Sequence, residues 1–255
     1  MRHAIVRPPG PNFADGLTTV DLGTPDLARA LEQHAAYCEA LERCGLALTR
    51  LPADPRHPDS TFVEDTAILT EHRAILTRPG APSREGEVAA IEGSLSSFFR
   101  ECRAIKAPGT LDGGDVCEAD GHFLIGISRR TNEEGARQLA AFLAEEGFTS
   151  SFIDIRGLEE ILHLKSGIAY PGEGRIVAIE ALVTHPALRP FVVLRVDAPE
   201  TYAANCVRIN ERLLIAAGHP RFEAALRELG YDTLALEMSE FQKMDGGLSC
   251  LSLRF

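Results

Sequence analysis

Reactive side chains occur at five points along the chain, each where a short apolar strand is about to begin. These points are Glu64-Asp65, Asp112 with Asp115, His163, Asn205-Cys206 and Ser249-Cys250. A cysteine near a histidine can form an activated thiolate nucleophile. Carboxylates beside a thiol raise its pKa by charge repulsion, so a site that contains both is suited to a cationic ligand. A guanidinium ion fits such a site, because its planar fork of N–H donors pairs with carboxylates and its central carbon is an electrophile.

Each of these residues also has an ordinary structural interpretation. His163 could be a structural histidine on a strand, and Cys206 and Cys250 could be core residues, because cysteine is among the most buried residue types. Asp112 could form a turn beside two glycines, and Glu64-Asp65 could cap a loop. Residue type and spacing do not say which cysteine would be the nucleophile. The functional interpretation depends on whether the fold brings the five points together.

The elements that would position these side chains form a recurring unit. Each unit reads as a strand, a tight polar turn, a second strand, usually a helix, and then a returning strand. The first strands are expected to begin near residues 63, 114, 164, 205 and 249, at spacings of 51, 50, 41 and 44 residues. The sequence predicts hairpins over 63–78, 114–128, 164–180 and 205–217, helices over 84–99, 132–146 and 220–229 with a shorter one after Glu180, and returning strands over 151–155, 191–196 and 231–236.

The fifth unit is divided between the two ends of the chain. Residues 250–255 are expected to pair with residues 3–7, followed by a helix over 27–44 and a strand over 46–51. Repeats of this length indicate radial or stacked units, and pairing the two ends would remove exposed sheet edges. The pattern predicts a single-domain α/β protein over residues 1–255, a five-unit α/β propeller. In a closed ring the five reactive points would converge at one end of the axis. An ordinary mixed α/β sheet is the alternative.

Composition narrows the function classes. The formal charge is −11 at pH 7, which disfavours nucleic acid as a partner and could attract a cationic small molecule. No stretch approaches about 18 uninterrupted apolar residues, so no membrane partner is expected. The first ten residues lack the apolar core of a signal peptide. Six cysteines without CxxC spacing fit reduced thiols in a cytoplasm, rather than a disulfide framework or a zinc finger.

Stretches along nearly the whole chain resemble one enzyme family. They include DGLT (15–18), PDSTFVEDTAI (58–68), LTRPGAPSREGE (76–87), APGTLDGGDV (107–116), RTNEEGARQ (130–138), LHLKSG (162–167), YAANC (202–206), NERLLIAAG (210–218) and KMDGGLSCLSLRF (243–255). In combination they are similar to the bacterial dimethylarginine dimethylaminohydrolases of the guanidino-group-modifying (pentein) superfamily. That superfamily has the five-unit propeller fold. The resemblance implies a dimethylargininase, a hydrolase that converts asymmetric dimethylarginine or monomethylarginine to citrulline and a methylamine through a covalent cysteine intermediate.

The resemblance also implies a role for each matching residue. Cys250 is the nucleophile, His163 the general acid and then base, and Asp112 the acid that orients His163 and touches the substrate. Cys206 is not the nucleophile in this family. The implied substrate-binding residues are Glu64 and Asp65 at the guanidinium, Arg84 and Arg130 at the carboxylate, Leu17 in a mobile lid, Asp59, the Met244 carbonyl and Phe62 in the pocket wall. Relatives often carry Glu where this chain has Asp112, which leaves the contact geometry at that position open.

Other functions remain as alternatives. An arginine or agmatine deiminase of the same superfamily typically carries HxD, whereas this chain has His163-Leu164-Lys165. Paired Arg84 and Arg130 favour an α-amino acid over agmatine. A non-catalytic propeller, as in a ribosome anti-association factor, would not need a cysteine, histidine and acid at the strand entries. The resemblance implies no cofactor and no metal, and a homodimer is compatible with it. If residues 163–165 lie on a strand, Lys165 points to the same side as His163 and must bend toward a carboxylate or solvent.

Overall fold

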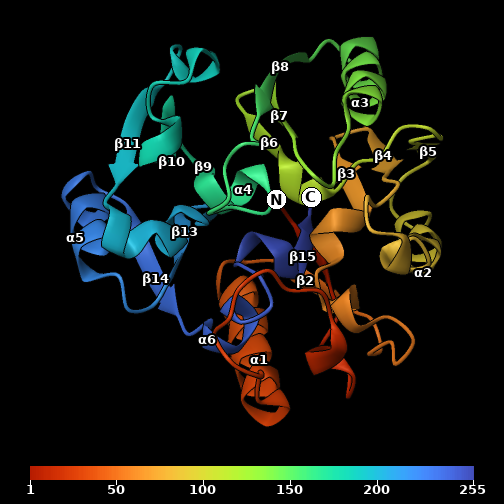
Figure 1. Cartoon of the computed structure of the whole chain (residues 1–255), viewed down its shortest axis with the longest axis horizontal. Coiled ribbons are helices and arrows are strands. Elements are labelled where there is room, and N and C mark those ends of the chain that lie inside the picture. Colours follow the sequence, from red (N-terminus) through yellow and green to blue (C-terminus); the bar gives the residue numbers. More distant parts are fainter.

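The computed structural model describes residues 1–255, in which five three-stranded sheets surround a central axis (Figure 1). Every sheet has the same plan, an antiparallel hairpin whose second strand pairs in parallel with a third. The expected five-unit α/β propeller is therefore confirmed. The strands of the first four sheets in chain order are β3 (Ala67–Leu69), β4 (Arg73–Leu76), β5 (Glu101–Ala104); β6 (Val116–Ala119), β7 (His122–Ile127), β8 (Thr149–Asp154); β9 (Ile168–Gly172), β10 (Arg175–Ile179), β11 (Val192–Val196); β12 (Val207–Ile209), β13 (Arg212–Ala216) and β14 (Asp232–Leu236).

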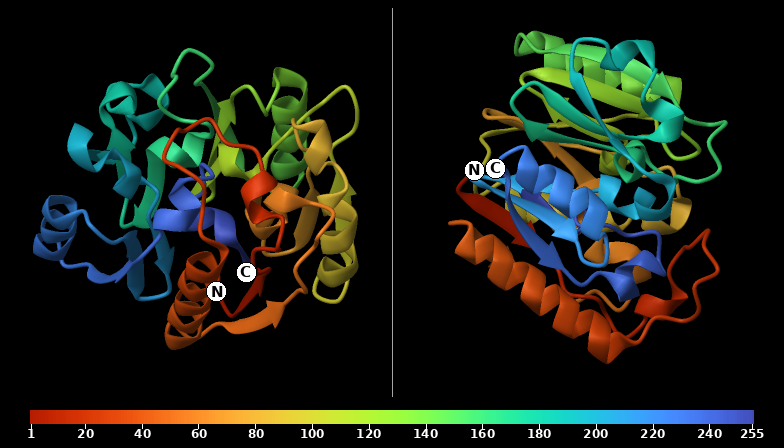
Figure 2. Two further views of the ribbon diagram at one scale, coloured as in Figure 1. Left: turned by 60° about the horizontal axis from the view of Figure 1, so that its bottom comes forward. Right: turned by 90° about the vertical axis from the view of Figure 1, so that its left-hand side faces the viewer.

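Both ends of the chain contribute to the fifth sheet, as expected. Strand β1 (His3–Val6) pairs antiparallel with β15 (Ser252–Arg254) and parallel with β2 (Ala47–Arg50). The ring is thus closed by backbone hydrogen bonds between residues nearly 250 positions apart. Figure 2 shows the two chain ends on the side of the molecule opposite the loop around residues 11–24.

The longer helices α1, α2, α3 and α5 lie on the outside of the ring, whereas α4 lies close to its axis (Figure 1), and local sequence explains where several of the helices begin. The helices are α1 (Leu27–Arg43), α2 (Glu87–Leu95), α3 (Glu133–Glu145), α5 (Pro220–Glu228) and the single turns α4 (Leu164–Gly167) and α6 (Ser239–Gln242). The side chains of Asp26 and Asn132 cap α1 and α3 by accepting backbone N–H bonds three residues later. Pro220 occupies the first turn of α5, where a missing N–H costs nothing.

Some boundaries differ from the expectation. Helix α2 is shorter than 84–99: residues Pro82–Arg84 form a separate 3₁₀ turn, and Gly86 and the serines after Leu95 are poor helix formers. Single 3₁₀ turns replace the weak helix after Glu180. Strand β5 and helix α6 were not predicted.

The largest difference lies at the strand entries. The first strand of each unit begins two to four residues later than expected, at 67, 116, 168, 207 and 252. A short helical turn precedes it in every unit. These turns are Val63–Thr66, Gly113–Asp115, Leu164–Gly167, Ala198–Ala204 and Ser249–Leu251.

Apolar side chains fill the space between the sheets, the helices and the neighbouring units. The largest cluster joins β9–β11 with α4 and the Ala198–Ala204 turn, and includes Ile168, Ile176 and Leu164. A second packs α1 against β1 and the 238–251 segment. No helix is both long and apolar enough to cross a bilayer.

Candidate active site

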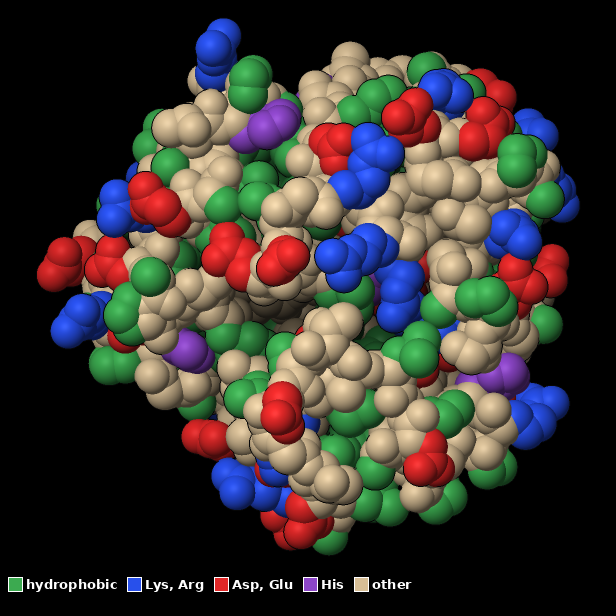
Figure 3. Space-filling model, viewed as in Figure 1, with side chains coloured by type: hydrophobic (Ala, Val, Ile, Leu, Met, Phe, Trp, Pro, Cys, Tyr) green, Lys and Arg blue, Asp and Glu red, His purple; other side chains and the backbone are tan.

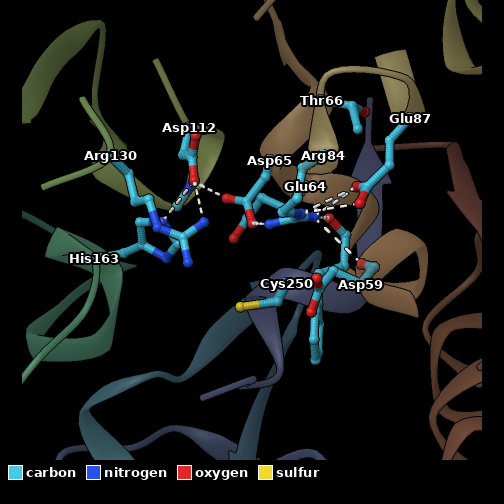
Figure 4. Close-up of polar contacts among 12 residues, drawn as sticks. Asp59, Glu64, Asp65, Thr66, Arg84, Glu87, Asp112, Arg130, His163 and Cys250 are labelled. Carbon is cyan, nitrogen blue, oxygen red and sulfur yellow. Dashed lines mark hydrogen bonds and ion pairs between the residues drawn. The ribbon is translucent and has the colours of Figure 1, made fainter. Parts of the chain in front are cut away.

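The five helical turns at the strand entries meet near the axis and carry the predicted reactive residues. Turn Val63–Thr66 supplies Asp65, residues 112–115 supply Asp112, residue His163 lies just before α4, and the Ser249–Leu251 turn supplies Cys250. Figure 4 shows these side chains converging from separate units, with the Cys250 sulfur directed into the space that they share. The prediction that these reactive side chains converge at one end of the axis is confirmed.

One small cavity contains most of this set. Its lining is Leu17, Asp59, Phe62, Asp65, Arg84, Arg130, Leu162, His163, Met244, Asp245, Gly246 and Cys250. Its volume is about 20 Å³, room for roughly one water molecule rather than an amino acid. A substrate therefore requires that the wall move. Figure 3 shows the face of the molecule on which this cavity lies. The surface is hollowed near the centre of that face, and basic side chains lie beside the hollow.

A carboxylate–imidazole pair forms one wall. His163 Nε2 lies 3.0 Å from Oδ2 of Asp112, which is fully buried. The Asp112 carboxylate is fixed in turn, because Oδ1 accepts the Gly80 N–H at 2.8 Å. Arg130 Nη1 lies 3.6 Å from the same carboxylate and has no hydrogen-bond partner. A buried guanidinium nitrogen without an acceptor is suited to an anionic group of a ligand.

A second carboxylate faces the cavity from the neighbouring unit. Asp65 Oδ1 accepts the Gly114 N–H at 2.7 Å, and Oδ2 accepts Arg84 Nη1 at 2.6 Å. Arg84 also bonds Glu87 through Nε and Nη2, and Nη2 faces the carbonyl oxygens of Asp59 and Phe62. Only Nη1 of Arg84 retains an N–H that is not committed within the protein. Arg84 therefore holds Asp65 in place and has less donor capacity to offer than Arg130.

The glycines of the TLDGGD motif allow this close convergence. A Cβ atom on Gly113 would lie 2.0 Å from the Glu64 carbonyl oxygen. One on Gly114 would lie 2.8 Å from the His163 ring and 2.9 Å from Asp65 Oδ1. The absence of a side chain at both positions lets the Asp65 turn and the His163 ring pack against one backbone.

The electrostatics of the site hold the imidazole charged and the thiol neutral. Burial alone would lower the pKa of His163, but the carboxylates of Asp65, Asp112 and Asp115 raise it to about 9. Burial and the carboxylates of Glu64 and Asp65 raise the pKa of the Cys250 thiol to about 12. A cation bound between Asp65 and Cys250 would offset this repulsion and favour the thiolate.

Cys206 does not line this cavity. It is buried, and burial raises the pKa of its thiol to about 12. It lines a second, larger cavity of about 440 Å³ on the side of the chain ends, together with Cys117 and Lys165. Of the two candidate thiols, only Cys250 shares a cavity with His163.

Glu64 also lies away from the predicted place. Its Oε1 accepts Lys165 Nζ at 2.6 Å and Arg254 Nη2 at 3.0 Å, and its Oε2 accepts the Ser249 hydroxyl at 2.7 Å. The carboxylate lines the second cavity and not the one that contains Cys250. Since adjacent residues on a helical turn point in different directions, Glu64 and Asp65 are separated onto the two sides of the same wall.

The expectation that Lys165 points to the side of His163 is wrong for the same reason. Residues 164–167 form a helical turn and not a strand, so Lys165 points into the second cavity, where it does reach a carboxylate. Asn205 completes the wall between the cavities. Its side chain accepts the Ser249 N–H at 2.9 Å and donates to the Ser249 hydroxyl and the Lys165 carbonyl.

The DGLT segment covers the cavity as a short lid. The Leu17 N–H donates to Asp59 Oδ1 at 3.0 Å, and the Thr18 hydroxyl donates to the Lys243 carbonyl at 2.9 Å. Leu17 is 41% exposed although it lines the cavity. Three polar contacts, including one from Thr19 N–H to Asp245, hold this segment over the cavity.

The donor atoms of Asp65, Asp112 and His163 lie within 4.8 Å of one another, the spacing of a metal site. All three groups are engaged with protein partners, Asp65 with Arg84 and Gly114 and Asp112 with Gly80 and His163. Each carboxylate oxygen already has a hydrogen-bond partner, so a metal ion would have to displace those partners, whereas a guanidinium N–H needs only a remaining lone pair. The arrangement suits acid–base chemistry on a cationic ligand better.

Sequence reasoning missed several residues of the site. Leu162, Asp245 and Gly246 line the cavity, and Thr131 fixes the Asp112 backbone through its hydroxyl. Asp245 and Gly246 belong to the KMDGGLSCLSLRF stretch and Leu162 to LHLKSG, so membership of these motifs was the available signal. Thr131 and Arg254 also lie in quoted stretches, but nothing local marks their contacts with Asp112 and Glu64.

No protein-family model matches the chain. The N(G),N(G)-dimethylarginine dimethylaminohydrolase of Pseudomonas aeruginosa is 45% identical over 256 residues, which cover all of both chains. A solved structure of the Pseudomonas aeruginosa enzyme, a cysteine-to-serine variant complexed with citrulline, matches with a TM-score of 0.96 at 45% identity over 100% of this chain and 99% of that one.

A second solved structure, a dimethylarginine dimethylaminohydrolase carrying a histidine-to-glycine substitution as an adduct with S-methyl-L-thiocitrulline, also gives a TM-score of 0.96 at 45% identity. It covers 100% of this chain and 99% of that chain. Fold, length and sequence agree along the entire chain. The chain belongs to the dimethylarginine dimethylaminohydrolase family.

Proposed function

We propose that the protein hydrolyses N-omega-methylated arginines, asymmetric dimethylarginine and monomethylarginine, to citrulline and the corresponding methylamine. The observation that carries this proposal is the single cavity lined by Cys250, His163, Asp65 and Arg130, with the buried Asp112 paired to His163 behind the cavity wall. A nucleophile, a proton donor, a cation site and an anion site are what an amino acid with a guanidinium end requires.

The anchoring of the substrate follows from the two charged ends of the cavity. Arg130 and the remaining N–H of Arg84 donate hydrogen bonds to the α-carboxylate of the substrate, while Asp65 accepts from the guanidinium. Asp59, the Met244 carbonyl and the Leu17 backbone lie beside the amino-acid end, and Phe62 forms the apolar wall. Glu64 acts through Ser249 rather than by direct contact with the guanidinium.

In the first chemical step Cys250 sulfur attacks the guanidinium carbon. The bound cation lies next to the thiol and offsets the repulsion from Glu64 and Asp65, so the thiol loses its proton to solvent when substrate binds. His163, held protonated by Asp112, gives its proton to the departing dimethylamine as the carbon–nitrogen bond breaks. A thiouronium between Cys250 and the remaining amidine is left.

In the second step neutral His163 accepts a proton from a water molecule that attacks the thiouronium carbon. As the carbon–sulfur bond breaks, the new hydroxyl group loses its proton to solvent, Cys250 leaves as a thiolate that is then protonated again, and citrulline is formed. The balance is methylarginine and water in, citrulline and amine out. The citrulline complex of the Pseudomonas aeruginosa enzyme supports the identity of the product.

The methylated substrate is favoured over free arginine by the position of Lys165. Deiminases place an acid two residues after the histidine, where it accepts N–H bonds from an unmodified guanidinium end. Here that residue is a lysine that points into the other cavity. A dimethylated nitrogen has no hydrogen to donate, so an acid facing it would be a buried acceptor without a donor, at a cost of about 1–3 kcal/mol. A site that lacks this acid avoids that cost.

The test is citrulline release from asymmetric dimethylarginine, monomethylarginine, arginine and agmatine at matched concentrations, with identification of the amine. The methylated arginines should react and free arginine hardly at all. Cys250→Ser should lower turnover by at least about a thousandfold, because a hydroxyl is a far weaker nucleophile. The matched control Cys206→Ser should remain within about tenfold of wild type. Highest kcat/KM for arginine with ammonia as product would make the protein a deiminase, and equal losses at both cysteines would refute the nucleophile.

We also propose that residues 1–255 act as a single hydrolase domain in the cytoplasm. The pairing of β1 with β15, which unites both chain ends in one sheet, supports the first part. Six free cysteines, five of them buried, support a reducing compartment.

A further inference from the structure

The second cavity contains two basic side chains that share one carboxylate oxygen. Lys165 Nζ lies 2.6 Å and Arg254 Nη2 3.0 Å from Oε1 of Glu64. The other Glu64 oxygen is occupied by the Ser249 hydroxyl. The side chains of Lys165 and Arg254 are only 15% and 13% exposed. Two positive charges therefore face one negative charge at the inner end of the cavity.

No other acidic group compensates this excess at the inner end. The remaining acceptors of Arg254 are neutral, the carbonyl oxygens of Ser249 and Ser252 and the Ser252 hydroxyl. The second carboxylate in the lining, Glu118, is exposed and accepts the Gly121 N–H of its own hairpin turn. A largely buried charge without a counter-charge is costly in a folded protein.

The outer wall adds to the positive charge. Arg208 also lines the cavity and donates to two neutral acceptors, the carbonyl oxygens of Pro171 and Asn210. Its nearest carboxylate is Glu173, which lies 3.8 Å away and is 55% exposed. The cavity is therefore basic, although the chain as a whole has a formal charge of −11.

We propose that this cavity binds a small oxyanion, held by Lys165 and Arg254 at its inner end. The volume of about 440 Å³ admits such an ion with several water molecules. Lys165 keeps two N–H donors after its bond to Glu64, since an ammonium group has three. The oxyanion supplies the missing negative charge and accepts these donors. This site is distinct from the carboxylate-binding end of the catalytic cavity, because no residue lines both cavities.

The proposal is tested by isothermal titration of inorganic phosphate into the full chain at constant ionic strength. Wild type should bind one phosphate per chain. Arg130→Ala should bind it equally well, since Arg130 belongs to the other cavity. Lys165→Met, which leaves Glu64 and Arg254 as a balanced pair, should weaken binding at least tenfold. The exposed Lys106→Met is the matched control and should behave as wild type.

A second variant changes the charge in the opposite direction. Glu64→Gln removes the shared carboxylate and should tighten phosphate binding at least threefold, which keeps the test decisive if Lys165→Met does not fold. The proposal is overturned if wild type does not bind phosphate, if Lys165→Met binds as wild type does, if Arg130→Ala loses the binding, or if Glu64→Gln fails to tighten it.

Discussion

Nearby carboxylates keep both reacting residues protonated at neutral pH, Cys250 as a neutral thiol and His163 as an imidazolium. Burial and the carboxylates of Glu64 and Asp65 raise the pKa of the Cys250 thiol to about 12. Burial would lower the pKa of His163, but Asp65, Asp112 and Asp115 raise it to about 9, so Asp65 acts on both groups. At neutral pH the site therefore carries an imidazolium and a neutral thiol. Such a site should become nucleophilic when a guanidinium enters, because the added positive charge favours the thiolate. Selectivity for cations thus follows from the resting charge state.

The pH profile of turnover should report the proton on His163. The kcat/KM of wild type is expected to fall above a pH of about 9, because the departing amine needs that proton and deprotonated His163 cannot supply it. Asp112→Asn replaces the hydrogen-bonded carboxylate by a neutral amide, which no longer favours the imidazolium. The basic limb should then move to lower pH, as measured by initial rates between about pH 6 and 10.5.

The exposed Asp232→Asn serves as the control and should leave the profile in place. A basic limb that stays unchanged in Asp112→Asn would mean that a group other than His163 sets it.

Among the elements, those defined by local chemistry could be predicted and those defined by distant contacts could not. The Asp120-Gly121 turn adopts the positive φ angles that these residue types allow, so the β6–β7 hairpin was predicted. Asn132 marked the start of α3. By contrast, strand β5 has the sequence ECRA, which lacks a clear apolar alternation and gave no signal.

The helical turns at the strand entries are the part of the site that sequence periodicity could not give. Leu164 N–H donates to Asp115 and Gly114 N–H to Asp65, in each case across 49 residues. Contacts of this range replace the strand that the local pattern suggests. The convergence of Asp65, Asp112, His163 and Cys250 was predicted because it depends only on the repeat. The orientations of Glu64 and Lys165 depend on the turns, so they were not.

Gly114→Ala tests how tightly these turns must pack. The added Cβ would lie 2.8 Å from His163 Cγ and 2.9 Å from Asp65 Oδ1, so the ring or the turn must shift. A displacement of a few tenths of an ångström to 1 Å should lower kcat by about 10- to 100-fold. The measurement is steady-state kinetics together with circular dichroism to confirm folding. Gly157→Ala, whose Cβ would meet nothing within 4 Å, is the matched control.

If the folded Gly114→Ala variant keeps wild-type kcat, the close packing of the glycine against His163 has no catalytic consequence.

On the scale of the whole molecule, two cavities share one axis and are divided by the side chains of the strand-entry turns. Asp65, His163 and Cys250 face the lid, while Glu64, Lys165 and Ser249 face the side of the chain ends. The dividing wall is tied together by Asn205 and by Arg254 of the last strand. The catalytic turn that carries Cys250 is therefore coupled to ring closure, because β15 follows it directly.

Circular permutation tests whether folding and activity depend on the closed ring or on the natural order of the chain. Residues near the two ends are already adjacent, since the N–H groups of Arg2 and His3 both donate to the Phe255 carbonyl, at 2.7 and 2.8 Å. Joining the two ends with a short Gly/Ser linker and opening the chain between the exposed residues Arg189 and Pro190 keeps all fifteen strands. The permuted protein should fold and hydrolyse methylarginine within about tenfold of wild type, because exposed loops tolerate new termini.

Deleting residues 252–255 from the natural order should instead abolish folding, because it removes the β15–β1 pairing, the Arg254–Glu64 contact and the support beneath Cys250. Thermal unfolding followed by circular dichroism, with citrulline release on the folded variants, distinguishes the two. A permutant that fails to fold while the deletion remains active would show that closure of the ring by the chain ends does not hold the active site together.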